Sequence, residues 1–327
     1  MDQMSKNSTD RTFMRKQPLP PSPLVLTEHV EDLLREPHGF GSFLFDTSGE
    51  VIVHNDATWL YTTVLSGTKW ESWVRPFAFK RMQAGLARRV LAAEPDDRRG
   101  AVLHHVIQIA PDFIVGFFSG GKSVQAAVAA GPDQPFQRDP SFKIDPVQGW
   151  ETQGGPPEGW VLEVNGALVK IQEDPGRLLF WQGYDSYLAT RLLGDLAWAK
   201  IMIDKKTRRI SLIARHPSNP LPFRRPAWSC ARCGGNLSSN VRIRGRYAFF
   251  YYFRPARAKD AYIALALCKD PLFQGPTDHF LVDRMRGREE VAEKFQAVPQ
   301  GKELLLFSES RFQDQSWHTG VRRFSVL

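Results

Sequence analysis

Apolar residues in this chain recur in short runs that are separated by turn-forming residues. One pattern, an alternating or apolar run, a tight turn and a strongly apolar or aromatic run, occurs five times, at 41–53, 104–121, 166–184, 240–253 and 293–310. The turns carry Gly, Pro, Asp or Asn, as β-hairpins require. The sequence therefore predicts five hairpins, each with an apolar or aromatic second strand.

A third strand is expected after at least two of these hairpins, because two distant segments resemble each other. SVQAAVAAGPDQPF (123–136) and AYIALALCKDPLF (261–273) both alternate small residues and then have a polar or glycine turn, Pro and Phe. The second strands of the hairpins lie near residues 52, 115, 180, 249 and 305, at spacings of 63, 65, 69 and 56. These spacings exceed the ~40–45 residues of a WD-type blade and suit four-stranded blades with long loops.

The repeats predict an all-β, five-bladed β-propeller over residues 25–327, as a single domain. Residues 1–24 are polar and then proline-rich, without an apolar stretch that could serve a signal peptide, and predict a flexible tail. The segment LVLTEHV (24–30) either supplies an outer strand to the last blade or leaves closure of the ring to another strand. A β-sandwich or jelly roll is the rival architecture.

Two segments depart from this pattern. In AFKRMQAGLARRVLAAEP (78–95), five apolar residues fall near one helical face, which predicts a peripheral α-helix packed on the outside of the fold. These residues are Phe79, Met82, Leu86, Val90 and Leu91. Contact of this basic helix with a membrane surface or an acidic partner is the alternative. The Pro/Gly-rich stretch 131–159 predicts a long inter-blade loop that shapes a binding site.

The charge and cysteine content change this picture only slightly. The net charge of +8 comes from 43 basic and 35 acidic residues that are scattered along the chain, so we expect no nucleic-acid partner; an anionic small substrate explains the excess as well. No run reaches the ~20 apolar residues of a membrane span. Three cysteines form no disulfide scaffold, and a cytoplasmic location follows by default. Cys230 and Cys233 lack a second CxxC pair, so they predict a loop with free thiols, no metal site and no cofactor.

The repeats resemble those of the five-bladed propeller glycosidases: arabinanases, β-xylosidases, invertases and levansucrases. Their third strands typically end in small-x-Ala-x-Ser-x-Asp-Pro-x-x-Phe, and residues 264–273 reproduce much of this motif, with Cys268 in place of Ser and Phe273 one position early. The hairpins that end in FFSGG (117–121) and FWQGYDS (180–186) are similar to the family's aromatic strand followed by Ser. The resemblance covers roughly residues 38–327.

The resemblance implies three carboxylates at the starts of the innermost strands, which act as base or nucleophile, pKa modulator and general acid. The Glu-Gly-Pro acid motif overlays Asn165-Gly166-Ala167. The Asp expected in the second unit falls at His104 or His105, and the fourth unit offers Asn240. None of the three carboxylates is matched at its expected position.

Three residues are the catalytic candidates. Glu163 is a general acid or base, because apolar neighbours in its strand would raise its pKa. His105 could shuttle protons near neutral pH, and Asp185 follows an aromatic strand. An exposed glutamate, a structural histidine and a set of core aromatics are the alternatives. Candidates for substrate binding are His104, Asn165, Trp181, Tyr184, Asn240, Arg254 and Glu309.

The leading prediction is a glycoside-hydrolase-like enzyme that acts on a small carbohydrate or glycosylated metabolite in the central funnel of the propeller. One alternative is a repurposed propeller that lacks the glycosidase carboxylates and catalyses a lyase, isomerase or cyclisation step. The other is a non-catalytic binding module. The expected partner is a small-molecule ligand, a sugar or an anionic metabolite, with no nucleic acid and no membrane. The sequence leaves the oligomeric state open.

Overall fold

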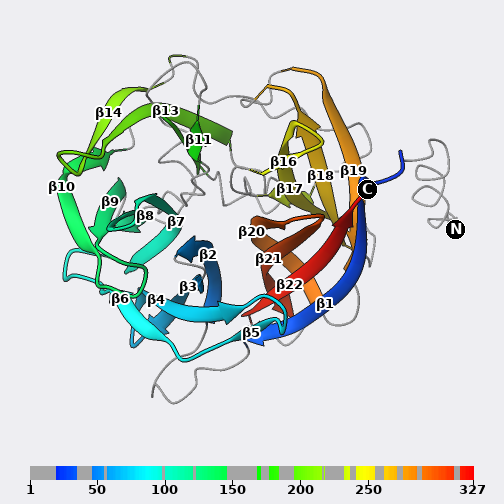
Figure 1. The fold of residues 1–327 in the computed structure, drawn as a ribbon, viewed down its shortest axis with the longest axis horizontal. Coiled ribbons are helices and arrows are strands. Elements are labelled where there is room, and N and C mark those ends of the chain that lie inside the picture. Colours follow the sequence, from blue (N-terminus) through cyan, green and yellow to red (C-terminus); the bar gives the residue numbers. More distant parts are fainter. Residues whose placement is uncertain are drawn as a thin grey trace, which may run out of the picture.

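The computed structural model describes residues 20–34, 46–54, 57–97, 100–120, 123–145, 168–170, 177–183, 195–215, 217, 232–235, 241–254, 261–270, 275–285, 289–312 and 317–327. All regular secondary structure within these residues is β-strand. The strands form five antiparallel sheets that follow one another around a central axis (Figure 1). The chain is therefore an all-β propeller, and the rival sandwich interpretation is wrong.

Four of the sheets begin at the axis with their earliest strand and add later strands outward (Figure 1). In the fifth, β20 is innermost and β1 is outermost. The first sheet contains β2 (Asp46–His54), β3 (Ala57–Ser66), β4 (Lys69–Ala78), β5 (Gln83–Ala84) and β6 (Arg88–Leu91), and the second contains β7 (Ala101–Ala110), β8 (Phe113–Gly120), β9 (Ser123–Ala129) and β10 (Gln137–Ile144). The third sheet contains β11 (Leu168–Lys170), β12 (Arg177–Gly183), β13 (Asp195–Asp204) and β14 (Arg209–Arg215), and the fourth contains β15 (Arg232–Gly235), β16 (Arg242–Ile243), β17 (Arg246–Arg254), β18 (Tyr262–Cys268) and β19 (Thr277–Arg284). The fifth sheet contains β20 (Glu289–Gln300), β21 (Glu303–Phe312), β22 (Trp317–Val326) and β1 (Leu24–Leu34).

The N-terminal strand closes the last sheet. β1 pairs antiparallel with β22, from Leu24 opposite Val326 onward, so the first of the two options for residues 24–30 is confirmed. The amide of Leu327 donates to the carbonyl of Pro23 over 3.0 Å, and the guanidinium of Arg244 donates to the carbonyl of Leu327 over 2.8 Å. Sequence-distant ends are thus joined within one sheet, which leaves no open edge between them.

Four of the five predicted hairpins are confirmed, as β7–β8, β11–β12, β16–β17 and β20–β21. The two similar third-strand segments are also confirmed, because β9 and β18 occupy the same position in their sheets. Their small residues are fully buried, as Ala126 and Ala264 illustrate. Small side chains are needed here because neighbouring sheets approach both faces of these strands.

The first hairpin differs from the prediction. Residues 46–50, expected to form its turn, belong to β2, which is irregular between Ser48 and Val51. β2 pairs with β3, whose apolar run includes the buried Leu60 and Tyr61. A bulge accommodates the Ser-Gly-Glu sequence without ending the strand. The second strand of this hairpin is therefore β3, which follows the predicted range of 41–53.

The predicted peripheral helix over 78–95 is wrong. β4 continues to Ala78, and the rest of the segment turns back to form β5 and β6, which both pair with β4. Met82 and Val90 are buried against different interior clusters, whereas Leu86 is 87% exposed. A helix would have placed these three side chains on one face. Pairing along β4 overrides a weak helical propensity that Gly85 already lowers.

The predicted loop over 131–159 is only partly correct, and the predicted N-terminal tail lies mostly outside the described residues. Residues 137–144 form β10, the outermost strand of its sheet, while 146–159 lie outside the described part. In the predicted tail, residues 1–19 also lie outside it, and Leu24 already begins β1. Among the described residues, no helix has the length and hydrophobicity that a membrane crossing requires.

The hydrophobic core is divided among the spaces between neighbouring sheets. One cluster joins the β15–β19 sheet to the sheet of β20, β21, β22 and β1, and others fill the next three spaces around the axis. A buried ion pair reinforces the first space: Arg322 of β22 donates through Nε to Asp283 of β19 over 2.7 Å and through Nη1 to Ser308 over 2.9 Å. This packing holds the innermost strands in fixed positions around the axis.

Candidate functional site

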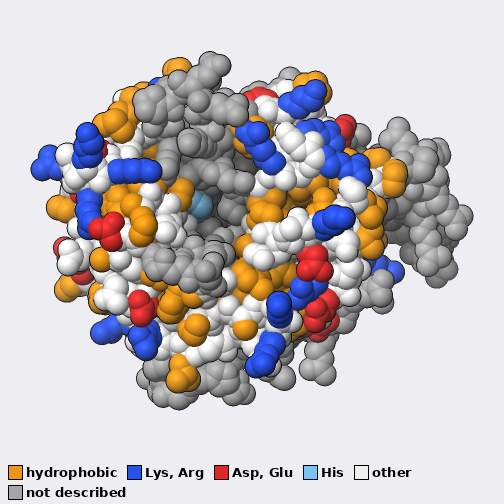
Figure 2. All heavy atoms as spheres, viewed as in Figure 1, with side chains coloured by type: hydrophobic (Ala, Val, Ile, Leu, Met, Phe, Trp, Pro, Cys, Tyr) orange, Lys and Arg blue, Asp and Glu red, His pale blue; other side chains and the backbone are white. Residues whose placement is uncertain are grey.

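The innermost strands meet at the propeller axis, where the sequence placed its candidate site. β2 contacts β7 on one side and β20 on the other, so β20, β2 and β7 are consecutive around the axis. Figure 2 shows the molecule hollowed near its centre, with a histidine side chain inside the hollow. Among the histidines whose side chains the structure describes, only His105 belongs to an innermost strand.

His105 lies in the first half of β7 and is 5% exposed. The register of β7 shifts between Leu103 and His105, and Leu103 and Val106 both pack into the cluster shared with the β2–β6 sheet. Strand alternation therefore puts His105 on the opposite face, with Ile107 and Ile109, which pack toward the β11–β14 sheet. The bulge thus directs the imidazole away from the neighbouring β2–β6 sheet.

The first positions of two innermost strands carry carboxylic residues that sequence reasoning missed. Asp46 is the first residue of β2, and Glu289 and Glu290 are the first two residues of β20. The sequence pattern predicts a turn at Asp46 and a strand of the last unit that begins at Glu293. No local sequence signal marks these strand starts, because pairing defines them: β21 runs to Phe312, and its pairing extends β20 back to Glu289.

Of the other predicted site residues, five lie outside the described residues and four lie in described strands. Glu163, Asn165, Tyr184, Asp185 and Asn240 lie outside the described residues. Four more lie in strands that the structure describes through their backbone: His104 in β7, and Trp181, Arg254 and Glu309 in the second strands β12, β17 and β21, one strand away from the axis. Arg254 pairs with Arg232, the first residue of the innermost strand β15, and Glu309 pairs with Glu293 of β20.

Cysteines and clusters of potential metal ligands are the remaining candidates for a site. No group of three or more His, Cys, Asp or Glu side chains in this part of the chain could hold a metal ion. Cys268 is buried, and its Sγ donates to the carbonyl of Pro276 over 3.4 Å. Cys233 lies in strand β15, so the expected thiol loop is wrong at this position, and Cys230 lies outside the described residues.

Comparison with known proteins supports the propeller at the level of the fold. No family model and no curated protein matches the sequence. Solved structures do match, among them the catalytic domain of the GH62 α-L-arabinofuranosidase of Coprinopsis cinerea, at 9% identity and a TM-score of 0.57 over 92% of this chain and 98% of that one. This chain shares the fold of the five-bladed propeller glycoside hydrolases.

Two further matches were solved with sugars bound. The α-L-arabinanase of Cellvibrio cellulosa, complexed with arabinohexaose, is 12% identical, with a TM-score of 0.53 over 85% of this chain and 91% of that one. The β-1,2-mannobiose phosphorylase of Listeria innocua, complexed with β-1,2-mannobiose, is 13% identical, with a TM-score of 0.51 over 91% and 96%. Because function resides in sites rather than in folds, these likenesses show the propeller fold alone.

Proposed function

We propose that this chain is a carbohydrate-active enzyme that cleaves a glycosidic bond in a small carbohydrate or glycosylated metabolite, at the centre of a closed five-bladed propeller. The observation that carries the proposal is the position of Asp46 and of Glu289 and Glu290 at the first residues of adjacent innermost strands. The fold is shared with enzymes that act on glycosides, which supports the same chemistry.

Glycoside cleavage requires one carboxyl that protonates the leaving oxygen and a second that attacks the sugar or activates water, with pKa values held apart. We assign the second role to Asp46, with a glutamate of β20 beside it to modulate its pKa. Glu163 is our choice for the general acid. His105, in the adjacent strand β7, would position the substrate or relay a proton.

Phosphorolysis is a second candidate reaction, because a phosphorylase of mannobiose shares the fold. In that reaction phosphate replaces water as the nucleophile, so the products are a sugar phosphate and the free leaving alcohol. A net charge of +8 is compatible with an anionic co-substrate.

The test is turnover of a panel of aryl and natural glycosides by the full chain, with and without inorganic phosphate. Asp46→Asn, Glu163→Gln, Glu289→Gln and Glu290→Gln are compared with Asp96→Asn, a change at an exposed turn residue. We expect loss of at least ~100-fold in the Asp46 variant, the range in which positioned acid–base groups act, and none in the control.

Silence across the whole panel, or full activity of the Asp46→Asn variant, would contradict the assignment. The first result would favour a lyase, isomerase or cyclisation reaction or a binding module. Turnover that depends on phosphate would select phosphorolysis over hydrolysis.

A further inference from the structure

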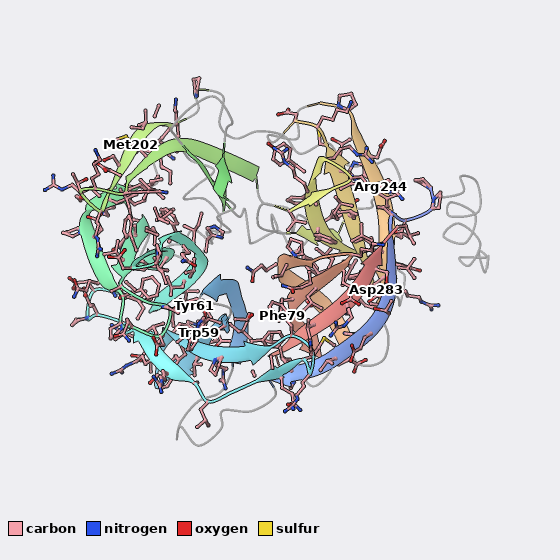
Figure 3. All side chains as sticks on the ribbon, in the orientation of Figure 1. Trp59, Tyr61, Phe79, Met202, Arg244 and Asp283 are labelled. Atoms are coloured by element: carbon pink, nitrogen blue, oxygen red, sulfur yellow. The ribbon has the colours of Figure 1, made fainter. Side chains whose placement is uncertain are left out.

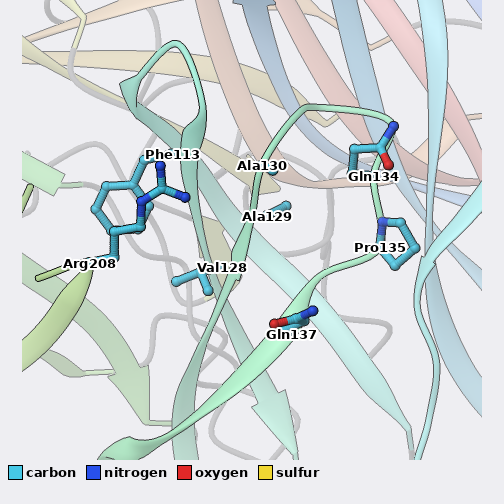
Figure 4. Close-up of a pocket in the computed structure, with 8 residues that line it drawn as sticks. All are labelled: Phe113, Val128, Ala129, Ala130, Gln134, Pro135, Gln137 and Arg208. Atoms are coloured by element: carbon cyan, nitrogen blue, oxygen red, sulfur yellow. The ribbon is translucent and has the colours of Figure 1, made fainter.

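A pocket of about 290 Å³ lies away from the axis, between the β7–β10 sheet and the turn that joins β13 to β14 (Figure 4). Phe113, which lines it, follows the turn that ends β7. A strand advances about 3.3 Å per residue, so the stretch of β7 from His105 to Ala110 places the pocket roughly 17 Å from the histidine. The pocket is therefore separate from the candidate site at the axis.

The pocket has an apolar floor and a polar rim. Phe113 and Ala129 are buried below it, at 2% and 6% exposed. Gln134 and Gln137 are exposed at the rim, and their side-chain amides carry hydrogen-bond donors and acceptors. One donor is already used, because Nε2 of Gln134 donates to Oδ1 of Asp133 over 3.2 Å. In Figure 4, Arg208 and Phe113 lie together on one side of the pocket, and Gln134 and Pro135 lie on the other. A ligand here would meet carbon atoms beneath it and hydrogen-bonding groups around its edge.

The charges at the rim are already balanced. The guanidinium of Arg208 forms an ion pair with Asp112, and its Cζ lies 5.9 Å from the centre of the Phe113 ring. Asp133, beside the pocket, forms an ion pair with Arg88 over 3.1 Å. An anion would have to compete with these carboxylates for the cations. The rim is therefore suited to a neutral polar ligand rather than a phosphate.

The rim is built on two turns held by hydrogen bonds. Oδ1 of Asp204 accepts hydrogen bonds from the amides of Lys206 and Thr207, over 2.8 and 3.3 Å. This arrangement holds Arg208 at the end of its turn, with a φ of 55°. On the other side, the amide of Gln134 donates to the carbonyl of Gly131 over 3.2 Å. A preformed rim lowers the entropy cost of binding.

We propose that this pocket binds one neutral sugar ring, either a monosaccharide or one residue of an oligosaccharide. A pyranose or furanose ring has a face of C–H groups for the apolar floor and hydroxyl groups for the two amides. The volume of about 290 Å³ lies just below the ~300–1,000 Å³ typical of ligand pockets, which suits a single ring. The proposal does not depend on catalysis at the axis, since none of its residues belongs to that site.

Saturation-transfer difference NMR on the full chain, with D-xylose, L-arabinose and D-mannose as probes, tests the proposal. Ala130→Phe places a bulky side chain at the exposed edge of the pocket, and Ala78→Phe is the matched control at an exposed position of β4. Gln137→Leu removes one amide at nearly constant size. At least one sugar should bind, at least tenfold more weakly in the Ala130 and Gln137 variants, and unchanged in the control.

Three results would overturn the proposal. The first is that none of the sugars binds, and the second is that a sugar binds equally well to Ala130→Phe and to the Ala78→Phe control. The third is that inorganic phosphate binds in place of the sugars and that this phosphate binding is lost in Arg208→Gly. The last variant keeps the turn, because glycine adopts a positive φ readily. Glycoside turnover is measured on the same variants, and unchanged turnover in Ala130→Phe would separate the pocket from any site at the axis.

Discussion

The ion pair between Arg322 and Asp283 predicts a large loss of stability when its acid is removed. The Arg322 side chain is fully buried, and Phe324, which shares its strand face, belongs to the apolar cluster between the two sheets. Replacing Asp283, labelled in Figure 3, by Ala removes a carboxylate partner of this buried guanidinium. Breaking a buried pair in this way costs about 3–5 kcal/mol in free energy of unfolding.

Urea unfolding followed by tryptophan fluorescence measures this change, with Asp278→Ala as the matched control. Asp278 forms an ion pair with Arg246, but its own side chain is 63% exposed, so its loss should cost ~0–1 kcal/mol. The double variant Arg322→Met, Asp283→Leu removes both charges and should recover most of the stability, because apolar replacements of similar volume are nearly neutral. If Asp283→Ala costs no more than Asp278→Ala at an unchanged m-value, the buried pair does not hold the two sheets together.

Three further changes test other contacts. Gly100→Ala should lower the free energy of unfolding by about 3 kcal/mol or more, because the φ of this residue is 118° and a Cβ would lie 2.0 Å from a backbone oxygen of β4. Gly67→Ala, at a φ of 62° in open space, should cost only ~1 kcal/mol, and the urea midpoints of the two variants measure the difference. Tyr61→Phe removes a buried hydrogen bond of 2.8 Å to a loop carbonyl and should cost ~1–2 kcal/mol. Because burial raises the pKa of Tyr61, ultraviolet titration to pH 12 should leave at least one tyrosine un-ionised in the folded wild type that ionises in the unfolded chain. Hydrogen bonds from Lys143 and a buried serine lower the pKa of Asp145, so this carboxylate should stabilise the fold above its ordinary pKa and lose that effect as the pH falls through the lowered pKa. Asp145→Asn should therefore flatten the decrease in the free energy of unfolding below pH ~4, and an unchanged decrease would contradict this.

Much of the candidate site depended on where strands begin, which the sequence alone does not reveal. His105 was a candidate from the sequence, but the face on which its side chain lies depends on the register shift between Leu103 and His105. Asp46 and Glu289 were not, because each looks like turn or loop sequence until its partner strand is known. The pocket beside Arg208 was equally hidden, since its residues come from two sheets whose contact has no local signal.

The sequence by itself determined the hairpins at 104–121 and 293–310 and the paired third strands, because alternation and turn chemistry act between residues close in the chain. Only the tertiary structure decided that residues 78–95 form strands, since pairing with β4 outweighs the local helical spacing. It also decided that β1 closes the sheet of β22, some 300 residues away, because that pairing depends on how all five sheets fit around one axis.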